Sequence, residues 1–137
     1  MKDFVLLDTD VCSFLLKKDS RAAYYAGYIV GRLPAISFVT VAELYQWMFL
    51  RKWAPSRIAA MEDALRKYLV IPFNRDLCKL WAQVSYQCRQ SGHEIKANDA
   101  WIAATALLYR IPLITHNRRD FRDIPSLTVI SQMPGEN

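Results

Sequence analysis

The sequence has no apolar run long enough to cross a lipid bilayer. Its hydrophobic stretches fall short of the ~18 consecutive residues that a transmembrane helix needs, although 53% of the 137 residues are hydrophobic. Residues 1–3 lead directly into a short strand-like segment and have none of the features of a signal peptide. These absences favour a cytoplasmic protein that does not act at a membrane.

Side chains that bind zinc or form disulfides are also few. Cys12, Cys78 and Cys88 are odd in number and none belongs to a Cys-x-x-Cys pair, so we expect reduced cysteines that pack in the interior. His93 and His116 have no partner at metal-ligand spacing. A zinc site is therefore disfavoured.

Internal repeats, low-complexity tracts and linkers are absent from the chain. Its length suits one domain with a single substantial core. Residues 1–137 are therefore predicted to form one domain, of which residues 133–137 are a frayed tail.

Positive charge is in excess, with 18 Lys and Arg against 13 Asp and Glu and a net charge of +5. Such an excess favours polyanionic partners such as nucleic acid, although it also suits an ordinary solvated surface. Aromatic residues interleaved with the cations could stack on bases if folding gathers both on one face. The basic pairs are Lys17-Lys18, Arg51-Lys52, Arg66-Lys67 and Arg118-Arg119, and the aromatic residues are Tyr24, Tyr25, Tyr28 and Trp53.

Short apolar segments alternate with amphipathic ones along the chain. This alternation is typical of a parallel sheet sandwiched by helices with right-handed crossovers, so the predicted fold class is α/β. Pro72 marks the third strand as an edge strand or a strand end. The predicted strands are 4–7, 33–38, 70–73, 111–115 and 127–130, and the predicted helices are 11–17, 21–30, 40–50, 57–68, 75–89 and a segment that begins at residue 98.

Acidic residues stand where several of these segments begin or end. Asp8 follows the first predicted strand and Glu43 follows the second, and open α/β sheets bind ligands beyond the carboxyl ends of their strands. Asp99 lies in the first turn of a largely apolar helix, after Asn98 as a natural N-cap. Simpler interpretations exist, because Thr40-x-x-Glu43 is also a capping box and Asp99 alone is an acid favoured by the helix dipole.

Carboxylates gathered in a partly dry pocket repel one another, so they need a cation or must be protonated. Oxygen ligands without His or Cys select hard cations such as Mg²⁺ or Mn²⁺, which also accept phosphate oxygens. A basic protein with such an ion suggests hydrolysis of phosphodiester bonds by a metal-activated water. Because water attacks instead of a 2′-OH, the expected products carry a 5′-phosphate and a 3′-OH.

Four motifs follow one another along essentially the whole chain. They are Leu-Leu-Asp8-Thr-Asp, Ile-Ser-Phe-Val-Thr40-Val-Ala-Glu43-Leu, Asn98-Asp99-Ala-Trp-Ile-Ala-Ala-Thr-Ala and Leu-Ile-Thr115-His-Asn117-Arg-Arg-Asp120-Phe121. In this order and spacing they resemble the motifs of PIN-domain ribonucleases of the VapC type, the toxins of prokaryotic toxin–antitoxin pairs. The resemblance implies a PIN-like three-layer fold with a central, mostly parallel sheet of four to five strands flanked by helices. It also implies that the start of the Asp99 helix lies beside Asp8.

The resemblance assigns a role to each matching acid. Asp8 and Asp99 are expected to be the Mg²⁺ (or Mn²⁺) ligands, and Glu43 to orient a metal-bound water or hold the ion through one. Asp120 takes the place of the family's last, more variable acid, which some members carry nearer Asn117. The supporting residues, which would position a carboxylate or the scissile phosphate, are Thr9, Thr40, Thr115 and Asn117.

Two further acids, Asp10 and Asp123, are interpreted as helix-start or surface residues. The resemblance further implies a type II toxin that cleaves structured RNA such as tRNA, a VapB-type antitoxin that blocks the acidic pocket, and a homodimer. An apolar antitoxin segment or a second subunit could dock on aromatic residues that are otherwise ordinary core residues, namely Tyr24, Tyr25, Tyr28, Trp47 and Trp53. A PIN-group nuclease of RNA processing and a non-catalytic RNA-binding module remain alternatives.

Overall fold

Five parallel strands form a single sheet in the order β3-β2-β1-β4-β5. The computed structural model describes residues 3–132, so the predicted tail at 133–137 lies outside the described residues. The strands are β1 Phe4–Leu7, β2 Leu33–Ser37, β3 Leu69–Ile71, β4 Leu113–Ile114 and β5 Val129–Ile130. The predicted α/β fold with its parallel sheet is confirmed, and β3 is an edge strand as Pro72 indicated.

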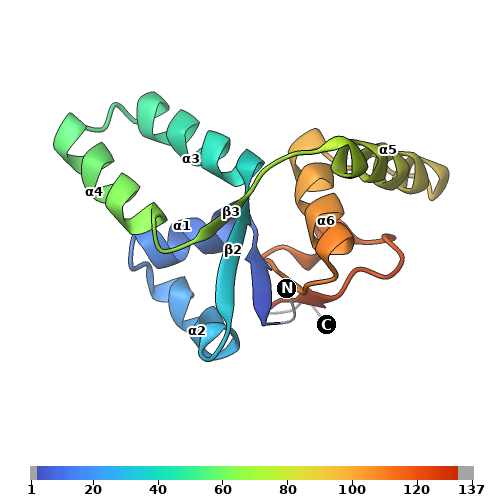
Figure 1. The fold of residues 1–137 in the computed structure, drawn as a ribbon, viewed down its shortest axis with the longest axis horizontal. Helices are drawn as coiled ribbons and strands as arrows, with labels where there is room; N and C mark the ends of the chain where they lie inside the picture. The colour runs from blue at the N-terminus through green and yellow to red at the C-terminus, as the bar shows by residue number, and fades with distance from the viewer. Residues whose placement is uncertain (1–2, 133–137) are drawn as a thin grey trace.

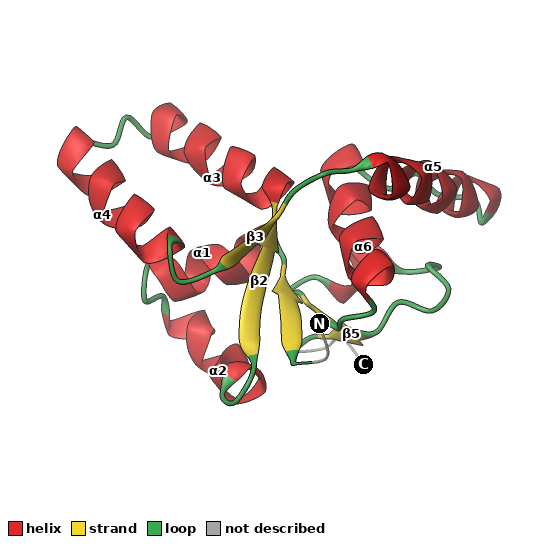
Figure 2. Ribbon diagram, viewed as in Figure 1, coloured by secondary structure: helices red, strands yellow, loops and turns green. Residues whose placement is uncertain are grey.

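Along the chain, α-helices connect each strand to the next, except that a 3₁₀ helix joins β4 to β5 (Figure 2). The α-helices are α1 Thr9–Leu16, α2 Ala23–Ile29, α3 Phe38–Leu50, α4 Pro55–Leu65, α5 Arg75–Gln90 and α6 Ala97–Tyr109. The 3₁₀ helices are η1 Ser20–Ala22 and η2 Arg118–Phe121. The predicted helix at 21–30 is therefore divided, since its first turn belongs to η1, which Asp19 caps through the backbone N–H of Arg21.

Alternating residues of the central strands bury opposite faces of the sheet. Leu6 packs into the core beneath α5 and α6, whereas Val5 and Leu7 pack into a second core with residues of α1, α3 and α4. In Figure 1, α1, α2 and α4 accordingly lie on one side of the sheet and α5 and α6 on the other. The two covered faces explain why the strand sequences are continuously apolar.

Within residues 3–132, no helix combines the length and the apolar character that spanning a membrane would require. The three cysteines are free thiols, of which Cys12 and Cys88 are buried. Cys78 is exposed on α5, so the expectation of an interior position is wrong for this residue.

Candidate active site

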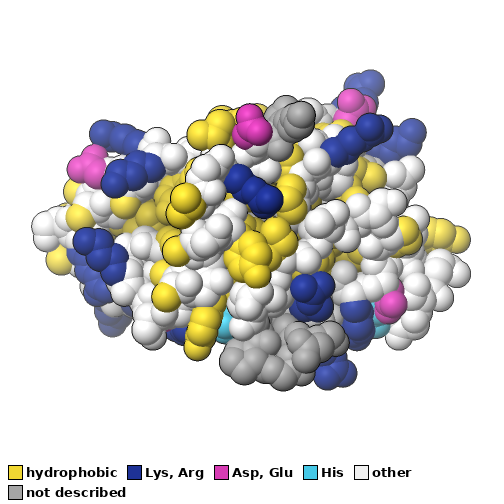
Figure 3. All heavy atoms as spheres, turned by 90° about the horizontal axis from the view of Figure 1, so that it is seen from below, with side chains coloured by type: hydrophobic (Ala, Val, Ile, Leu, Met, Phe, Trp, Pro, Cys, Tyr) yellow, Lys and Arg dark blue, Asp and Glu magenta, His cyan; other side chains and the backbone are white. Residues whose placement is uncertain are grey.

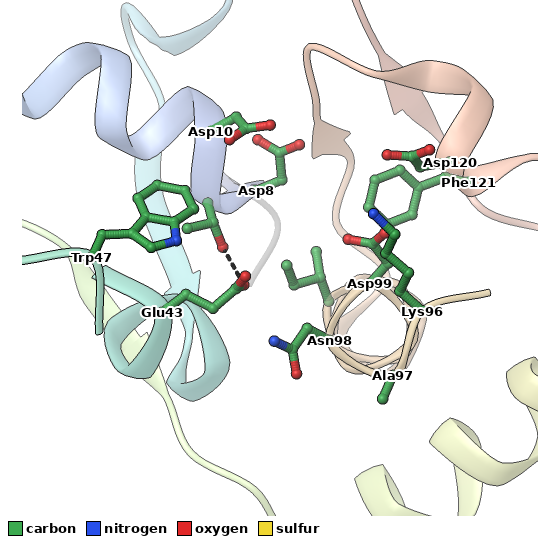
Figure 4. Close-up of a pocket in the computed structure, with 12 residues that line it drawn as sticks. Asp8, Asp10, Glu43, Trp47, Lys96, Ala97, Asn98, Asp99, Asp120 and Phe121 are labelled. Carbon is green, nitrogen blue, oxygen red and sulfur yellow. Dashed lines mark hydrogen bonds between the residues drawn. The ribbon is translucent and has the colours of Figure 1, made fainter. Parts of the chain in front are cut away.

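Acidic side chains from four segments line a pocket of about 400 Å³ at the carboxyl ends of the strands (Figure 4). Asp8 follows β1, Glu43 lies in the second turn of α3, which follows β2, and Asp120 lies in η2 after β4. Asp99 enters from the start of α6 on the opposite side of the pocket. Segments more than a hundred residues apart in the sequence therefore contribute carboxylates to one cavity.

Asp8 is the most deeply buried of these acids. Its side chain is 6% exposed, and it caps α1 by accepting a hydrogen bond from the backbone N–H of Val11 at 2.9 Å. The Thr115 hydroxyl donates to the other carboxylate oxygen at 2.5 Å. Burial raises the pKa of Asp8 to about 7, although these two hydrogen bonds lower it, and the charges of Asp10 and Asp99 raise it further.

A chain of hydroxyl groups orients Glu43. Thr9 Oγ1 donates to Glu43 Oε1 at 2.8 Å and lies 2.9 Å from Thr40 Oγ1. Because a hydroxyl has one proton and Thr9 gives its proton to the carboxylate, Thr40 must donate to Thr9. The capping-box interpretation of Thr40 and Glu43 is wrong, since α3 begins at Phe38 and Ser37 caps it through the N–H of Val39.

Asp99 lies in the first turn of α6, which begins at Ala97 and has Lys96 in the N-cap position without a side-chain cap bond. The prediction that Asn98 caps this helix is therefore wrong. Burial raises the pKa of Asp99 to about 6, repulsion from Asp120 and Glu43 adds to the rise, and Lys96 lowers it. Burial and like charges thus outweigh the one positive charge that acts on Asp99.

Asp120 is tied to Asp8 through the loop after β4. Asn117 Nδ2 donates to Asp120 Oδ2 at 2.8 Å, and the Asn117 backbone N–H donates to Thr115 Oγ1 at 3.0 Å. Thr115 in turn donates to Asp8. All four predicted acids thus line the pocket. The predicted supporting residues Thr9, Thr40, Thr115 and Asn117 lie in it or against it, and they join Glu43, Asp8 and Asp120, but not Asp99, into two hydrogen-bonded groups.

Three pocket residues were missed by the sequence analysis. Asp10 lines the pocket and faces it beside Asp8, so its interpretation as a surface acid was incomplete. Lys96 and Trp47 also line it. Asp10 follows Asp8 by two residues at the start of α1, and residues two apart on a helix do not share a face, so their spacing did not indicate a common cavity. Asp123, by contrast, lies outside the pocket lining, with its Oδ2 3.2 Å from His93 Nε2.

The aromatic residues of the early helices divide between core and surface. Tyr25 is fully buried and Tyr24 is 48% exposed. Trp47 and Trp53 are partly buried, Trp47 in the pocket wall and Trp53 beside Arg57, whose guanidinium carbon lies 3.7 Å from the indole centre. The core interpretation holds for Tyr25.

The donor atoms of the pocket suit a hard divalent cation, since they are carboxylate, hydroxyl and amide oxygens. Among residues 3–132, however, no three His, Cys, Asp or Glu side chains lie close enough together to hold an ion by themselves. Asp8 and Asp10 lie on one wall, and Asp99 and Asp120 on the opposite wall (Figure 4). This arrangement fits Mg²⁺, which commonly keeps several waters and binds to only one or two carboxylates.

Fold and pocket together agree with one family. The profile of the PIN domain matches residues 5–127, and the chain belongs to this family. Within it the chain is similar to Ribonuclease VapC1 of Haemophilus influenzae, strain R2866, at 31% identity over 126 residues, which are 89% of this chain and 92% of the relative. The resemblance to VapC-type members is thereby confirmed.

Solved structures agree with this assignment. The structure of VapBC-1 from nontypeable Haemophilus influenzae contains a chain with a TM-score of 0.81 and 30% identity, covering 93% of this chain and 97% of that one. The structure of VapBC2 from Rickettsia felis, bound to a DNA fragment from their promoter, contains a chain with a TM-score of 0.83 and 23% identity. The match covers 94% of this chain and 98% of that one. The second likeness supports the fold alone.

Proposed function

We propose that the protein is a Mg²⁺-dependent endoribonuclease, the toxin of a type II toxin–antitoxin pair, which hydrolyses structured RNA such as tRNA. The observation that carries the proposal is the single pocket lined by Asp8, Glu43, Asp99 and Asp120 at the carboxyl ends of the strands. The curated relative is named a ribonuclease, which supports the same reaction class.

Asp8 and Asp99 would hold the ion. The two oxygens of Asp8 each accept one hydrogen bond, so each keeps a lone pair for a further ligand. Asp99 lies in the same pocket, and its raised pKa would return toward its ordinary value beside a cation. When bound, Mg²⁺ or Mn²⁺ supplies a polarised water as nucleophile and stabilises negative charge on the phosphate.

The remaining residues would position the reacting groups. Glu43, fixed by Thr9, is oriented to accept a proton from the attacking water. Asn117 and Thr115 hold Asp120 and Asp8 at a fixed separation across the pocket. Lys96 at the pocket wall brings a positive charge near the place where the phosphate would lie.

A VapB-type antitoxin is the proposed protein partner, because the similar solved chain was determined as part of a VapBC complex. The proposal includes a homodimer, as the family resemblance implies. It also includes a cytoplasmic location, which the free thiols of the described chain favour.

The experiment is cleavage of total RNA and of purified tRNA with Mg²⁺ and with excess EDTA. We expect cleavage only with the metal, products with 5′-phosphate and 3′-OH ends, and loss of cleavage in Asp99→Asn. Products with 2′,3′-cyclic phosphate, or full activity in EDTA, would contradict the proposal. RNA binding without cleavage, unchanged in Asp99→Asn, would assign the chain to the class of RNA-binding modules.

A further inference from the structure

A second cavity, of about 410 Å³, opens beside the acidic pocket and shares Asp10 and Trp47 with it. Its other walls come from α1, the loop that follows α1, the end of α3 and the loop after β4. It is lined by three cations, Lys17, Arg21 and Arg51. We call it the basic cavity.

Two of these cations are available to a ligand. Arg21 is engaged by Asp19 through two hydrogen bonds of 2.8 and 2.9 Å, so their charges compensate each other. Within residues 3–132, neither Lys17 nor Arg51 forms an ion pair. Burial and the positive charges of Arg51 and Arg57 lower the pKa of Lys17, and the negative charge of Asp19 offsets this only in part.

The imidazole of His116 also lines this cavity. Tyr25 Oη lies within hydrogen-bond distance of His116 Nδ1 and also accepts from the backbone N–H of Gln132 at 3.4 Å. Where Tyr25 donates its proton to Nδ1, the other ring nitrogen, Nε2, carries a proton that it can donate to a ligand. The imidazole is held between Phe14 and Tyr24, with ring centroids at 5.2 and 6.2 Å.

We propose that the basic cavity binds the RNA phosphate next to the scissile one, through Lys17 and Arg51 with His116 as a further donor. This proposal rests on the proposed ribonuclease function, and it describes where the RNA strand lies on the protein. An RNA strand with its scissile phosphate over the acidic pocket would cross Asp10 and Trp47 and place a neighbouring phosphate among these cations. Because the acidic pocket repels a phosphate until a metal is bound, affinity for the strand must come from adjacent positive charge.

The location of the cations distinguishes this cavity from a general basic surface. Lys17 and Arg51 line the cavity, whereas the second residue of each of these two basic pairs does not. The basic pairs at 66–67 and 118–119 do not line it either. On the face seen in Figure 3, Lys and Arg side chains are scattered among hydrophobic ones and form no single patch. The cations of the basic cavity are therefore gathered by folding beside the one pocket that would hold the reacting phosphate.

The test is binding of a short fluorescein-labelled single-stranded RNA in EDTA, measured by anisotropy at several KCl concentrations. The double variant Lys17→Ala/Arg51→Ala is expected to raise Kd about tenfold at 0.1 M salt. It should also reduce the slope of log Kd against log salt by about 0.7 for each RNA phosphate that the protein no longer neutralises. The control variant Arg75→Ala/Lys79→Ala removes the same two charges from exposed positions on α5. It should retain the wild-type slope.

A charge-conserving variant, Lys17→Arg/Arg51→Lys, is expected to bind RNA nearly as the wild type does, and thermal melts verify that all variants fold. Equal weakening in the cavity and control variants would overturn the proposal, because only the net charge would then matter. If the double variant Lys17→Ala/Arg51→Ala keeps the wild-type RNA affinity but no longer binds an antitoxin co-expressed from the adjacent reading frame, the cavity binds protein. That result would also overturn the proposal. Failure of the proposed function would appear separately, as wild-type protein that does not cleave RNA with Mg²⁺.

Discussion

Replacing Asp99 by asparagine is expected to stabilise the metal-free protein at neutral pH and at the same time abolish RNA cleavage. The ionised Asp99 is partly buried and lies near the negative charges of Asp120 and Glu43, which raise its pKa. An amide of the same shape has no charge to repel. A residue that destabilises the fold and is retained for chemistry is typical of a functional site.

The magnitude follows from the pKa. A rise from 3.8 to about 6 corresponds to about 3 kcal/mol of differential interaction. Solvent screening of the partly exposed carboxylate reduces this to about 1–2 kcal/mol. For a chain of this size, that gain should raise the melting temperature by about 3–8 °C.

The pH dependence has a definite sign. Because the pKa of Asp99 is higher in the folded state, protonated Asp99 stabilises the fold below its ordinary pKa of 3.8, and this contribution is lost as the pH rises through about 6. The wild type should therefore lose stability relative to Asp99→Asn between these values. At pH 7.5 the full difference in unfolding free energy between Asp99→Asn and the wild type should be present.

The assay is urea unfolding in EDTA at several pH values between 4 and 7.5. Asp76→Asn is the matched control, because Asp76 occupies the first turn of α5 but is exposed, so its substitution should give no stabilisation. Adding Mg²⁺ should stabilise the wild type and not Asp99→Asn. A variant that is no more stable than the wild type at pH 7.5, or that Mg²⁺ stabilises equally, would refute the reasoning.

Three further predictions concern the support of the site and the core. Thr9→Val removes the hydroxyl that fixes Glu43, so kcat should fall about 10- to 100-fold with KM little changed, and Thr9→Ser should restore it. Asp120→Asn should lower the pKa of Asp99 by removing the like charge that raises it most, which nuclear magnetic resonance titration of the carboxyl carbon in EDTA would detect. Leu77→Ala, at a fully buried position of α5, should destabilise the protein by about 2–5 kcal/mol in urea unfolding, with RNA affinity of the folded protein unchanged.

The fold was largely predictable from local patterns. Continuous apolar strands such as residues 4–7, separated by amphipathic helices, require a parallel sheet covered on both faces, and Asp8 and Glu43 follow two of its strands. Helix starts were less predictable. Thr40-x-x-Glu43 fits a capping box, yet Ser37 caps α3 earlier, and the hydroxyl that engages Glu43 comes from Thr9, 34 residues away.

Tertiary contacts set the positions of Asp99 and of the cavity cations, which sequence periodicity could not predict. The approach of α6 to β1, which brings Asp99 to the pocket, followed only from the family resemblance, because a crossover helix need not begin at the carboxyl edge of the sheet. The same limit applies to the basic cavity. Lys17 and Arg51 end different helices, α1 and α3, and only the packing of those helices places both charges on one cavity.

We propose above all that carboxylates on opposite walls of one pocket bind a divalent ion together. Titration of the metal-free protein with Mn²⁺, followed by electron paramagnetic resonance of the free ion, tests it most directly. Binding should be present in the wild type and lost or weakened at least tenfold in both Asp8→Asn and Asp99→Asn, but retained in Asp76→Asn. Wild-type affinity in both site variants would contradict the account.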